Sequence, residues 1–322
     1  MSDEIEMTDE AAGSTSAAWE SRLDALLKYI EPFENYINGG FPDALCSEAK
    51  SKPFALSYSS ISKLVDNPLR FYEYVVNSKF LGRKEPTKAM LIGQIADDYI
   101  LSRMNGELGY VSMSAVHKRN TKAGKQAFAD EQDALKKRYP DAIIVDKATY
   151  ELAQNVVHSL VGDYIYQGIR HFVRPQAYQL LDTYAVASKV RFKYVCPKFG
   201  LTVVGEVDLY GKDADGEWYA ADLKSMAAVD NKAFYYSVRD RLLYLQAYIY
   251  KVALKQVFDI DIKSYYVIAG CVDGHSNIYR LTSRDFDKGK QDYEQGLATF
   301  ANCQLLGAPA FVSSYDINKY EF

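Results

Sequence analysis

The chain contains GEVDLY at residues 205–210, GKDADGE at 211–217, WYAADLK at 218–224 and YLQAYIY at 244–250. Two short apolar runs joined by a turn rich in Gly and Asp predict a β-hairpin. The first strand of this hairpin carries Asp208, and the second carries Asp222 and Lys224. The aromatic segment that follows, which we expect to be helical, carries Gln246.

The chemistry of phosphodiester cleavage explains why two aspartates and a lysine in this pattern are of interest. A phosphodiester reacts slowly because its negative charge repels incoming hydroxide and because an alkoxide is a poor leaving group. Mg²⁺ counters both problems, and it prefers oxygen ligands, usually one or two carboxylates together with waters and phosphate. Asp208 and Asp222 on adjacent strands could supply the carboxylates, and the backbone carbonyl of Leu223 a further ligand. These residues together suggest a metal-dependent phosphodiesterase centre.

Lys224 lies two residues beyond Asp222 and therefore on the same face of the strand. Its ammonium group could orient or help to deprotonate an attacking water and offset charge that develops on phosphorus. Taken singly, Glu206 and Asp208 also fit exposed positions of a half-buried strand, and Asp222 with Lys224 fits a surface ion pair. The combination is more specific, because the strand carboxylate precedes Asp222 by fourteen residues and a Gln-bearing aromatic helix follows.

The composition is that of an ordinary globular chain, with 322 residues, 48% hydrophobic and 25% charged. The formal net charge of −4 argues against a protein that coats nucleic acid non-specifically, although a local basic groove is compatible with it. The four cysteines lie far apart without a C-x-x-C pair, so neither a zinc site nor a disulfide framework is indicated. The sequence shows no long apolar run and no signal-peptide pattern, so we expect a cytoplasmic protein that does not enter a membrane.

The chain divides by composition into four parts. Residues 1–16 are acidic, small and polar, which predicts a disordered tail. Residues 17–52 comprise an amphipathic helix, expected over 17–37, and a linker. Residues 53–306 contain no repeat or low-complexity break, so we expect one α/β domain with a central mixed β-sheet flanked by helices. Residues 307–322 form a C-terminal tail.

Within 53–306 the periodicity of apolar residues predicts an alternation of helices and strands. A short helix after Leu56 is expected to be interrupted at Asn67-Pro68. The expected longer helices are the stretches 88–104, 148–171, 241–254 and 286–303. The expected strands, besides the hairpin, are the stretches 178–181, 185–187, 190–195, 201–204, 265–269 and 278–281.

A further carboxylate of interest lies on the helix expected over 88–104. Asp97 follows Gly93 by one helical turn, on a face where the glycine permits close approach by another element. A solvated helix carboxylate is the alternative interpretation of Asp97.

The most basic patch of the chain is HKRNTKAGK at residues 117–125. Basic residues broken by Gly and Asn suit contact with backbone phosphates better than the reading of bases. A solvated basic loop is the alternative.

The residues quoted above resemble the motifs of the PD-(D/E)XK nuclease superfamily. GEVD at 205–208 resembles the first motif, Asp222-Leu223-Lys224 the second, and Tyr244-x-Gln246-x-x-x-Tyr250 the helical Gln-Tyr motif. Within the superfamily, RNTKAGK at 119–125 and AMLIG at 89–93 resemble segments of the phage-type exonuclease VIII (RecE-like) group, which is related to RecB-type nuclease domains. The resemblance covers roughly residues 56–306.

This resemblance implies a restriction-endonuclease-like core and a Mg²⁺-dependent deoxyribonuclease, with Mn²⁺ as a substitute ion. It implies digestion of linear double-stranded DNA from its ends, from 5′ to 3′, leaving 3′ single strands for recombination or repair. A single-strand annealing protein as partner, a ring-shaped homo-oligomer and a bacterial or phage-infected host cell are further implications. The residues concerned are Asp97, Asp208, Asp222 and Leu223 for metal; Lys224, Gln246 and Tyr250 for catalysis with the two strand aspartates; and Arg119, Lys122 and Lys125 for DNA phosphates.

The chain departs from its relatives at particular positions. Asp97 stands where the relatives carry a His near the metal, and no Pro stands beside Asp208. No iron–sulfur cluster is expected, because Asn67-Pro68 stands where the early Cys of cluster-bearing relatives would fall and no late Cys cluster exists. A structure- or sequence-specific endonuclease is one alternative. A non-catalytic DNA-binding or assembly module is another.

Overall fold

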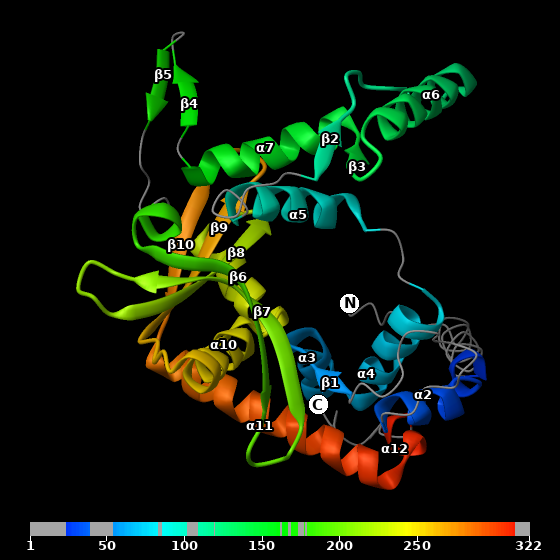
Figure 1. Ribbon diagram of the computed structural model, residues 1–322, viewed down its shortest axis with the longest axis vertical. Helices are drawn as coiled ribbons and strands as arrows, with labels where there is room; N and C mark the ends of the chain where they lie inside the picture. The colour runs from blue at the N-terminus through cyan, green and yellow to red at the C-terminus, as the bar shows by residue number, and fades with distance from the viewer. Residues whose placement is uncertain are drawn as a thin grey trace, which may run out of the picture. The chain divides into compact units, whose positions relative to one another are not determined.

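The computed structural model describes residues 24–38, 54–82, 86–101, 109–118, 120–161, 163–166, 169–172, 177 and 179–312 (Figure 1). Its contacts divide the chain into two units. The first unit combines residues 1–84, 195–203 and 294–322, and the second combines 85–194 and 204–293. The boundaries expected at residues 17, 53 and 307 stay predictions, and the tail expected over 1–16 lies outside the described residues.

The central sheet is mixed, as the sequence predicted. Its strands are β1 Ala55–Leu56, β6 Ala185–Val195, β7 Thr202–Lys212, β8 Trp218–Met226, β9 Ser264–Cys271 and β10 Ser276–Leu281. They follow the order β1-β7-β8-β9-β10, with β6 also paired to β7. The pairs β7–β8 and β9–β10 are antiparallel, whereas β1–β7 and β8–β9 are parallel.

The hairpin of β7 and β8 forms where the sequence predicted it, with Leu209 paired to Ala221. In the turn, Asp213 Oδ1 accepts hydrogen bonds from two backbone N–H groups at 3.0 and 2.9 Å. Gly216 has a φ of 78°, a conformation that glycine adopts without steric cost. The side-chain hydrogen bonds and the glycine together fix the turn, and the turn fixes the register of the two strands.

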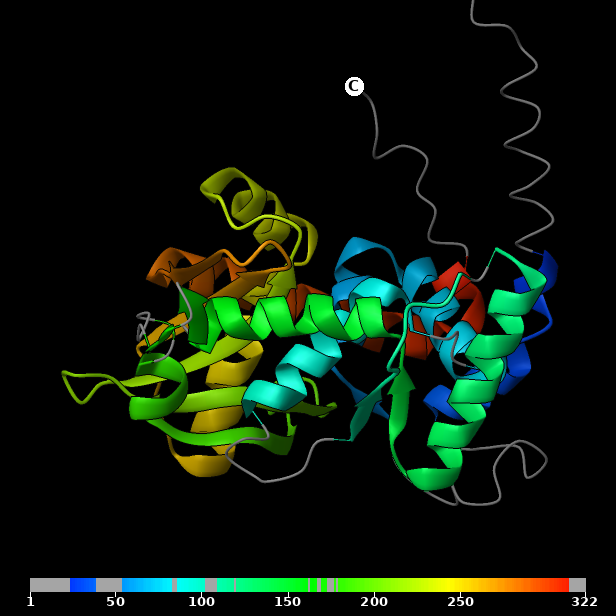
Figure 2. The ribbon, with the colours of Figure 1, turned by 90° about the horizontal axis from the view of Figure 1, so that it is seen from above.

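The second unit contains the helices α5 Lys88–Leu101, α7 Lys147–Val161, α9 Asn231–Asp240 and α10 Leu243–Phe258. α5 and α7 lie side by side on one face of the sheet (Figures 1 and 2). Their apolar side chains form one core with those of the strands, including Ile95, Val157 and Leu223. α10 covers the other face (Figure 1). A mixed sheet between helices confirms the predicted α/β fold class.

The prediction of a helix over 148–171 is wrong in its second half. α7 ends at Val161 and is followed by the antiparallel strands β4 (Asp163–Tyr166) and β5 (Ile169–Phe172). After Val161 the sequence combines glycines with aromatic and β-branched residues, which favour turns and strands over helix.

The strand expected over 178–181 is also wrong, because a π-helix, η3, occupies Gln179–Thr183. Leu180 and Leu181 are both buried, and the carbonyl of Leu180 accepts a hydrogen bond from Tyr219 Oη at 2.5 Å. A short apolar run fits a buried helical turn as well as a strand, so the local pattern could not decide. The separate strands expected over 185–187 and 190–195 are the single strand β6.

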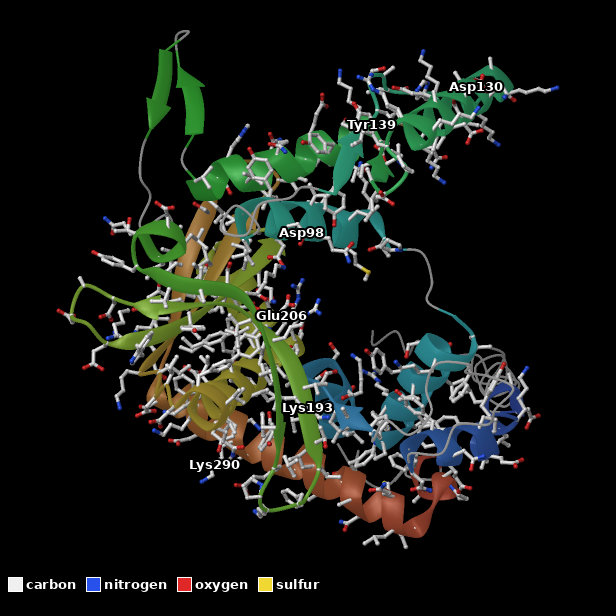
Figure 3. The ribbon with its side chains drawn as sticks, viewed as in Figure 1. Asp98, Asp130, Tyr139, Lys193, Glu206 and Lys290 are labelled. Carbon is white, nitrogen blue, oxygen red and sulfur yellow. The ribbon has the colours of Figure 1, made fainter. Side chains whose placement is uncertain are left out.

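A smaller element follows α5 in the second unit. The strands β2 (Tyr110–Ser112) and β3 (Ile143–Val145) pair in parallel beside α6 (Lys122–Arg138). Helix α6 has no buried residue, and its side chains stand away from it on several sides in Figure 3.

The first unit contains α2 Ile30–Ile37, α3 Tyr58–Asp66, α4 Pro68–Val75, the π-helix η1 Val76–Phe80 and α12 Ala308–Val312, and α11 (Ser283–Leu306) has residues in both units. The helix expected over 17–37 is broken by a turn at residues 28–29, and its beginning lies outside the described residues. Asn67 caps α4, and Pro68 occupies its first position, where a missing N–H breaks no helical bond. Within the described ranges, no helix combines the length and apolarity needed to cross a bilayer.

Candidate active site

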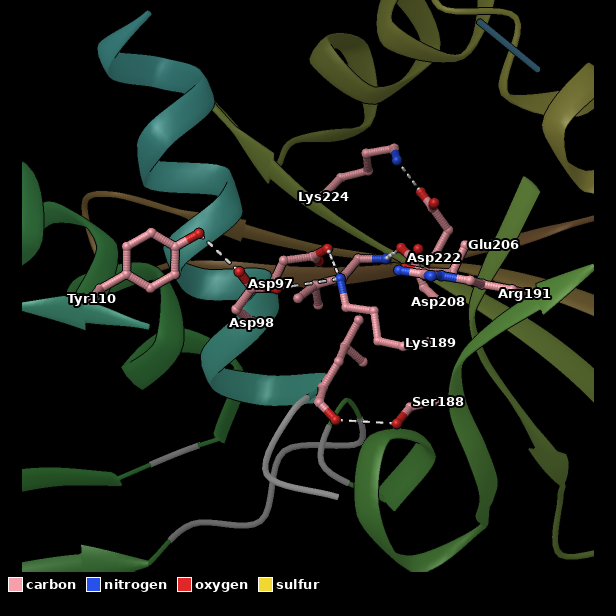
Figure 4. Close-up of polar contacts among 12 residues, drawn as sticks. Asp97, Asp98, Tyr110, Ser188, Lys189, Arg191, Glu206, Asp208, Asp222 and Lys224 are labelled. Carbon is pink, nitrogen blue, oxygen red and sulfur yellow. Dashed lines mark hydrogen bonds and ion pairs between the residues drawn. The ribbon is translucent and has the colours of Figure 1, made fainter. Parts of the chain in front are cut away.

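Two carboxyl groups, one half-buried and one buried, form the centre of the site (Figure 4). Asp208 on β7 and Asp222 on β8 lie at neighbouring positions of the antiparallel pair, and Asp222 is only 1% exposed. Asp208 Oδ2 accepts a hydrogen bond from the backbone N–H of Leu223 at 3.1 Å. Burial raises the pKa of Asp208 well above its usual value, and the charges of Asp222 and Asp97 raise it further. Neighbouring carboxyl groups that are largely shielded from water favour a shared proton or a bound cation.

Lys224 completes the Asp-x-Lys pair on β8. Its Nζ lies 2.5 Å from Asp222 Oδ2. Leu223, between the two, packs in the apolar core with α5 and α7. The spacing of two residues thus brings the acid and the lysine into contact, as the sequence predicted, because side chains alternate between the faces of a strand.

Gln246 and Tyr250 lie one turn apart on α10, and both are buried. Gln246 Nε2 donates hydrogen bonds to Asp222 Oδ1 at 2.7 Å and to Tyr250 Oη at 2.9 Å. Burial raises the pKa of the Tyr250 phenol well above 10, and the charges of Asp208 and Asp222 act in the same direction, so the phenol stays neutral. One oxygen of Asp222 therefore faces an amide and the other an ammonium group, which fixes the orientation of its carboxylate.

Asp97 lies on α5 and faces a lysine (Figure 4). Its Oδ2 is 2.8 Å from Lys189 Nζ, and the same Nζ lies 3.6 Å from Asp98 Oδ1. Burial raises the pKa of Asp97, an effect that Lys189 opposes. Among the residues that the structure describes, no three His, Cys, Asp or Glu side chains are arranged to hold a metal ion. The role of Asp97 as a third metal ligand therefore stays a prediction.

The sequence did not point to Lys189, which lies on β6. Its φ of 52° is in the left-handed region, which is unusual for a residue within a strand. Burial alone would lower the pKa of Lys189, but the charges of Asp97, Asp208 and Asp98 raise it. The one available signal was the interruption between the strands expected over 185–187 and 190–195, which falls at Ser188-Lys189.

Comparison with protein families agrees with this geometry. The family model described as the PD-(D/E)XK nuclease superfamily matches residues 55–304. The chain belongs to this superfamily. The predicted superfamily and the general activity of a nuclease are thereby confirmed, whereas the narrower exonuclease VIII group is a matter for proposal.

Solved structures similar to this nuclease are distant. A protein of Eubacterium rectale described as an exonuclease candidate has 14% identity and a TM-score of 0.48, over 77% of this chain and 81% of its own. A protein named SSO0001 has 10% identity and a TM-score of 0.26, over 66% of this chain and 87% of its own. No curated protein gives a match. The assignment to the superfamily therefore rests on the family model and on the motifs.

Nucleases of this superfamily typically use a divalent metal ion, and the residues of the site fit such an ion in donor type. The half-buried Asp208 and the buried Asp222 offer carboxylate oxygens whose charges repel each other. A hard cation prefers such oxygens and would relieve this repulsion. The carbonyl of Leu223 stays a predicted ligand, and its N–H group is the one that contacts Asp208.

A pocket of about 690 Å³ lies beside this centre, between α5 and the end of β8. Asp97, Lys224 and Arg241 contribute its charged groups. The rest of its lining is mainly small or apolar, namely Ala89, Met90, Ile92, Gly93, Gln94, Leu223, Ser225, Met226, Ala227 and Val272.

The predicted DNA-binding residues lie at the start of α6. Lys122 and Lys125 are exposed there, and Arg119 lies outside the described residues. Thr121 caps the helix, since its Oγ1 accepts a hydrogen bond from the N–H of Gly124 at 3.0 Å. Helix α6 lies beside β3, away from the strands that carry the aspartates (Figure 1). The structure therefore does not bring these lysines into the centre of the site.

Glu206, whose role the sequence left open, lies beside Arg191 (Figure 4). Glu206 Oε2 is 3.2 Å from Arg191 Nε, and the arginine side chain is 89% exposed. Glu206 thus takes part in an exposed ion pair two residues before Asp208 on β7.

Proposed function

We propose that this nuclease is a Mg²⁺-dependent exonuclease that hydrolyses linear double-stranded DNA from its ends. We further propose that it digests from 5′ to 3′ and leaves 3′ single strands for recombination or repair. The observation that carries hydrolysis is the contact of Lys224 with Asp222 next to Asp208, whose pKa is well above its usual value. End preference and polarity rest on the resemblance of residues 119–125 and 89–93 to the exonuclease VIII group.

In this proposal Asp208 and Asp222 hold the metal ion through carboxylate oxygens, and Mn²⁺ can replace Mg²⁺. When bound, the ion supplies positive charge beside the scissile phosphate and makes a water more acidic. Lys224 Nζ, 2.5 Å from Asp222 Oδ2, orients the attacking water and offsets the negative charge that builds on the phosphate. Gln246 and Tyr250 act through Asp222, which they keep in one orientation.

The basic start of α6 binds the phosphate backbone outside the centre. Lys122 and Lys125 are exposed at the first turn of a helix, where backbone N–H groups also favour anions. Arg119 extends this group in the sequence. A ring-shaped homo-oligomer and a single-strand annealing partner follow from the resemblance to the exonuclease VIII group.

An end-labelled linear duplex and a covalently closed circle, incubated with the protein in Mg²⁺, test the proposal. We expect the linear duplex to be degraded, with label at a 5′ end released first, and the circle to stay intact. Release of 3′ label first would contradict the polarity. Cutting of the circle would favour a structure- or sequence-specific endonuclease of the same superfamily instead.

A further inference from the structure

The site contains a second lysine that no motif of the sequence explains. Lys189 comes from β6, whereas Lys224 comes from β8. Its Nζ is bonded to Asp97 Oδ2 at 2.8 Å and lies 3.6 Å from Asp98 Oδ1, and its side chain is 22% exposed. Asp98 is engaged on its other oxygen, since Oδ2 accepts a hydrogen bond from Tyr110 Oη at 2.8 Å. The ammonium group therefore lies in a half-buried position among carboxylates of α5.

The backbone of β6 has an unusual conformation at Lys189. Lys189 adopts a φ of 52°, and the other non-glycine residues with positive φ in the described ranges, Leu242 and Asp259, flank helix α10. A left-handed residue inside a strand redirects its side chain, as in a β-bulge. The preceding Ser188 fixes the strand at this point, because its Oγ donates a hydrogen bond to the carbonyl of Leu101 at 3.1 Å.

Lys189 belongs to a group of interacting charges. Asp97, Asp208 and Asp222 act on one another electrostatically, and both Lys189 and Lys224 act on this group. Without Lys189, Lys224 would be the lysine left among these three carboxylates, a balance that would favour two divalent ions, as in two-metal phosphodiesterases. With Lys189, the carboxylate of Asp97 already has a cationic partner.

We propose that the ammonium group of Lys189 takes the place of a second divalent cation beside Asp97, so that the site binds a single metal ion through Asp208 and Asp222. This inference rests on the proposed metal-dependent function. It gives Asp97 a role as the positioning residue of Lys189 instead of a metal ligand.

Counting bound Mn²⁺ tests this directly and does not depend on activity. The full chain is titrated into the millimolar range of Mn²⁺, and free ion is measured by electron paramagnetic resonance, with calorimetry as a second readout. We expect one ion per chain for wild type and two for Lys189→Met. Lys193→Met, at an exposed lysine of the same strand (Figure 3), is the matched control and should bind one. Two ions in wild type, or one in Lys189→Met, would overturn the proposal.

Asp97→Asn separates the two roles of Asp97. As a positioning residue it should leave the single ion in place, with an affinity within about 100-fold of wild type. A larger loss of affinity would make Asp97 a metal ligand and overturn the proposal. Asp208→Asn should lose the ion, and if it does not, the proposed metal centre fails before the role of Lys189 is in question. Far-ultraviolet circular dichroism of each variant confirms that the change is local.

Discussion

The site has two halves: the first contains Asp208 and Asp222, and the second contains Asp97. They differ in the groups that offset the negative charge of their carboxylates. Around Asp222, one oxygen contacts the ammonium group of Lys224 and the other the amide of Gln246, yet the neighbouring Asp208 is left with a strongly raised pKa. Around Asp97, burial also raises the pKa, and Lys189 forms the ion pair with this carboxylate while lying near Asp98. In the proposal above, the added cation belongs to the first half, and Lys189 serves the second. This difference indicates where a metal ion belongs.

The largest effect is expected at the first half. Asp222→Asn removes a charge that both the ion and Lys224 require, so the rate of cleavage should fall by at least about 1000-fold. Asp215→Asn, at an exposed position of the β7–β8 turn, is the matched control and should cleave like wild type. Equal cleavage by Asp222→Asn and its control would remove the first half from the mechanism.

A smaller loss is expected when the support of Asp222 is removed. Gln246→Leu deletes the hydrogen bonds to Asp222 Oδ1 and Tyr250 Oη, so activity should fall about 10- to 100-fold. The free energy of unfolding should fall by about 1–3 kcal/mol, because buried polar atoms lose their partner. Steady-state cleavage and urea denaturation measure the two effects. An unchanged cleavage rate with lowered stability would make Gln246 a purely structural residue.

The raised pKa of Asp208 predicts a dependence of stability on pH. The folded protein binds a proton here more tightly than the unfolded chain does, so this contribution is present at low pH, below the unfolded pKa, and is lost as pH rises through the folded pKa. In a metal chelator, the melting temperature of wild type should therefore decline with rising pH more than that of Asp208→Asn. Mg²⁺ should reverse the decline. Parallel pH profiles for the two proteins would contradict this.

The smallest effect is expected outside both halves. Arg191→Gln removes the partner of Glu206, but the arginine is 89% exposed, so the free energy of unfolding should change by less than about 0.5 kcal/mol. Activity in Mg²⁺ should also stay near wild type. A loss comparable to that of Gln246→Leu would show that the site extends to Glu206.

The sequence predicted the residues of the first half of the site better than those of the second. Asp222 with Lys224 and Gln246 with Tyr250 were found because their spacings, two along a strand and four along a helix, act locally. Gly205 of the first motif is required by tertiary packing, because a Cβ added there would lie 2.5 Å from the ring of Phe192. The sequence did not predict Lys189 as a site residue. Its position depends on a left-handed backbone conformation and on the packing of β6 against α5, and the spacing of residues along the chain indicates neither.

The wrongly predicted helix and strand also depend on tertiary contacts that the local sequence does not show. The stretches 148–171 and 178–181 are short or mixed apolar runs whose local pattern fits helix and strand. Tertiary contacts, such as the hydrogen bond from Tyr219 Oη to the carbonyl of Leu180, decided the second of them. The central hairpin was predicted more reliably because its turn residues and its alternation agree with each other.

The most direct test of the account is the rate of cleavage by Lys224→Met under single-turnover conditions in Mg²⁺, measured together with its affinity for a labelled linear duplex. The account predicts that cleavage slows by at least about 1000-fold while affinity for the duplex stays within about tenfold of wild type. Cleavage at the wild-type rate would contradict it.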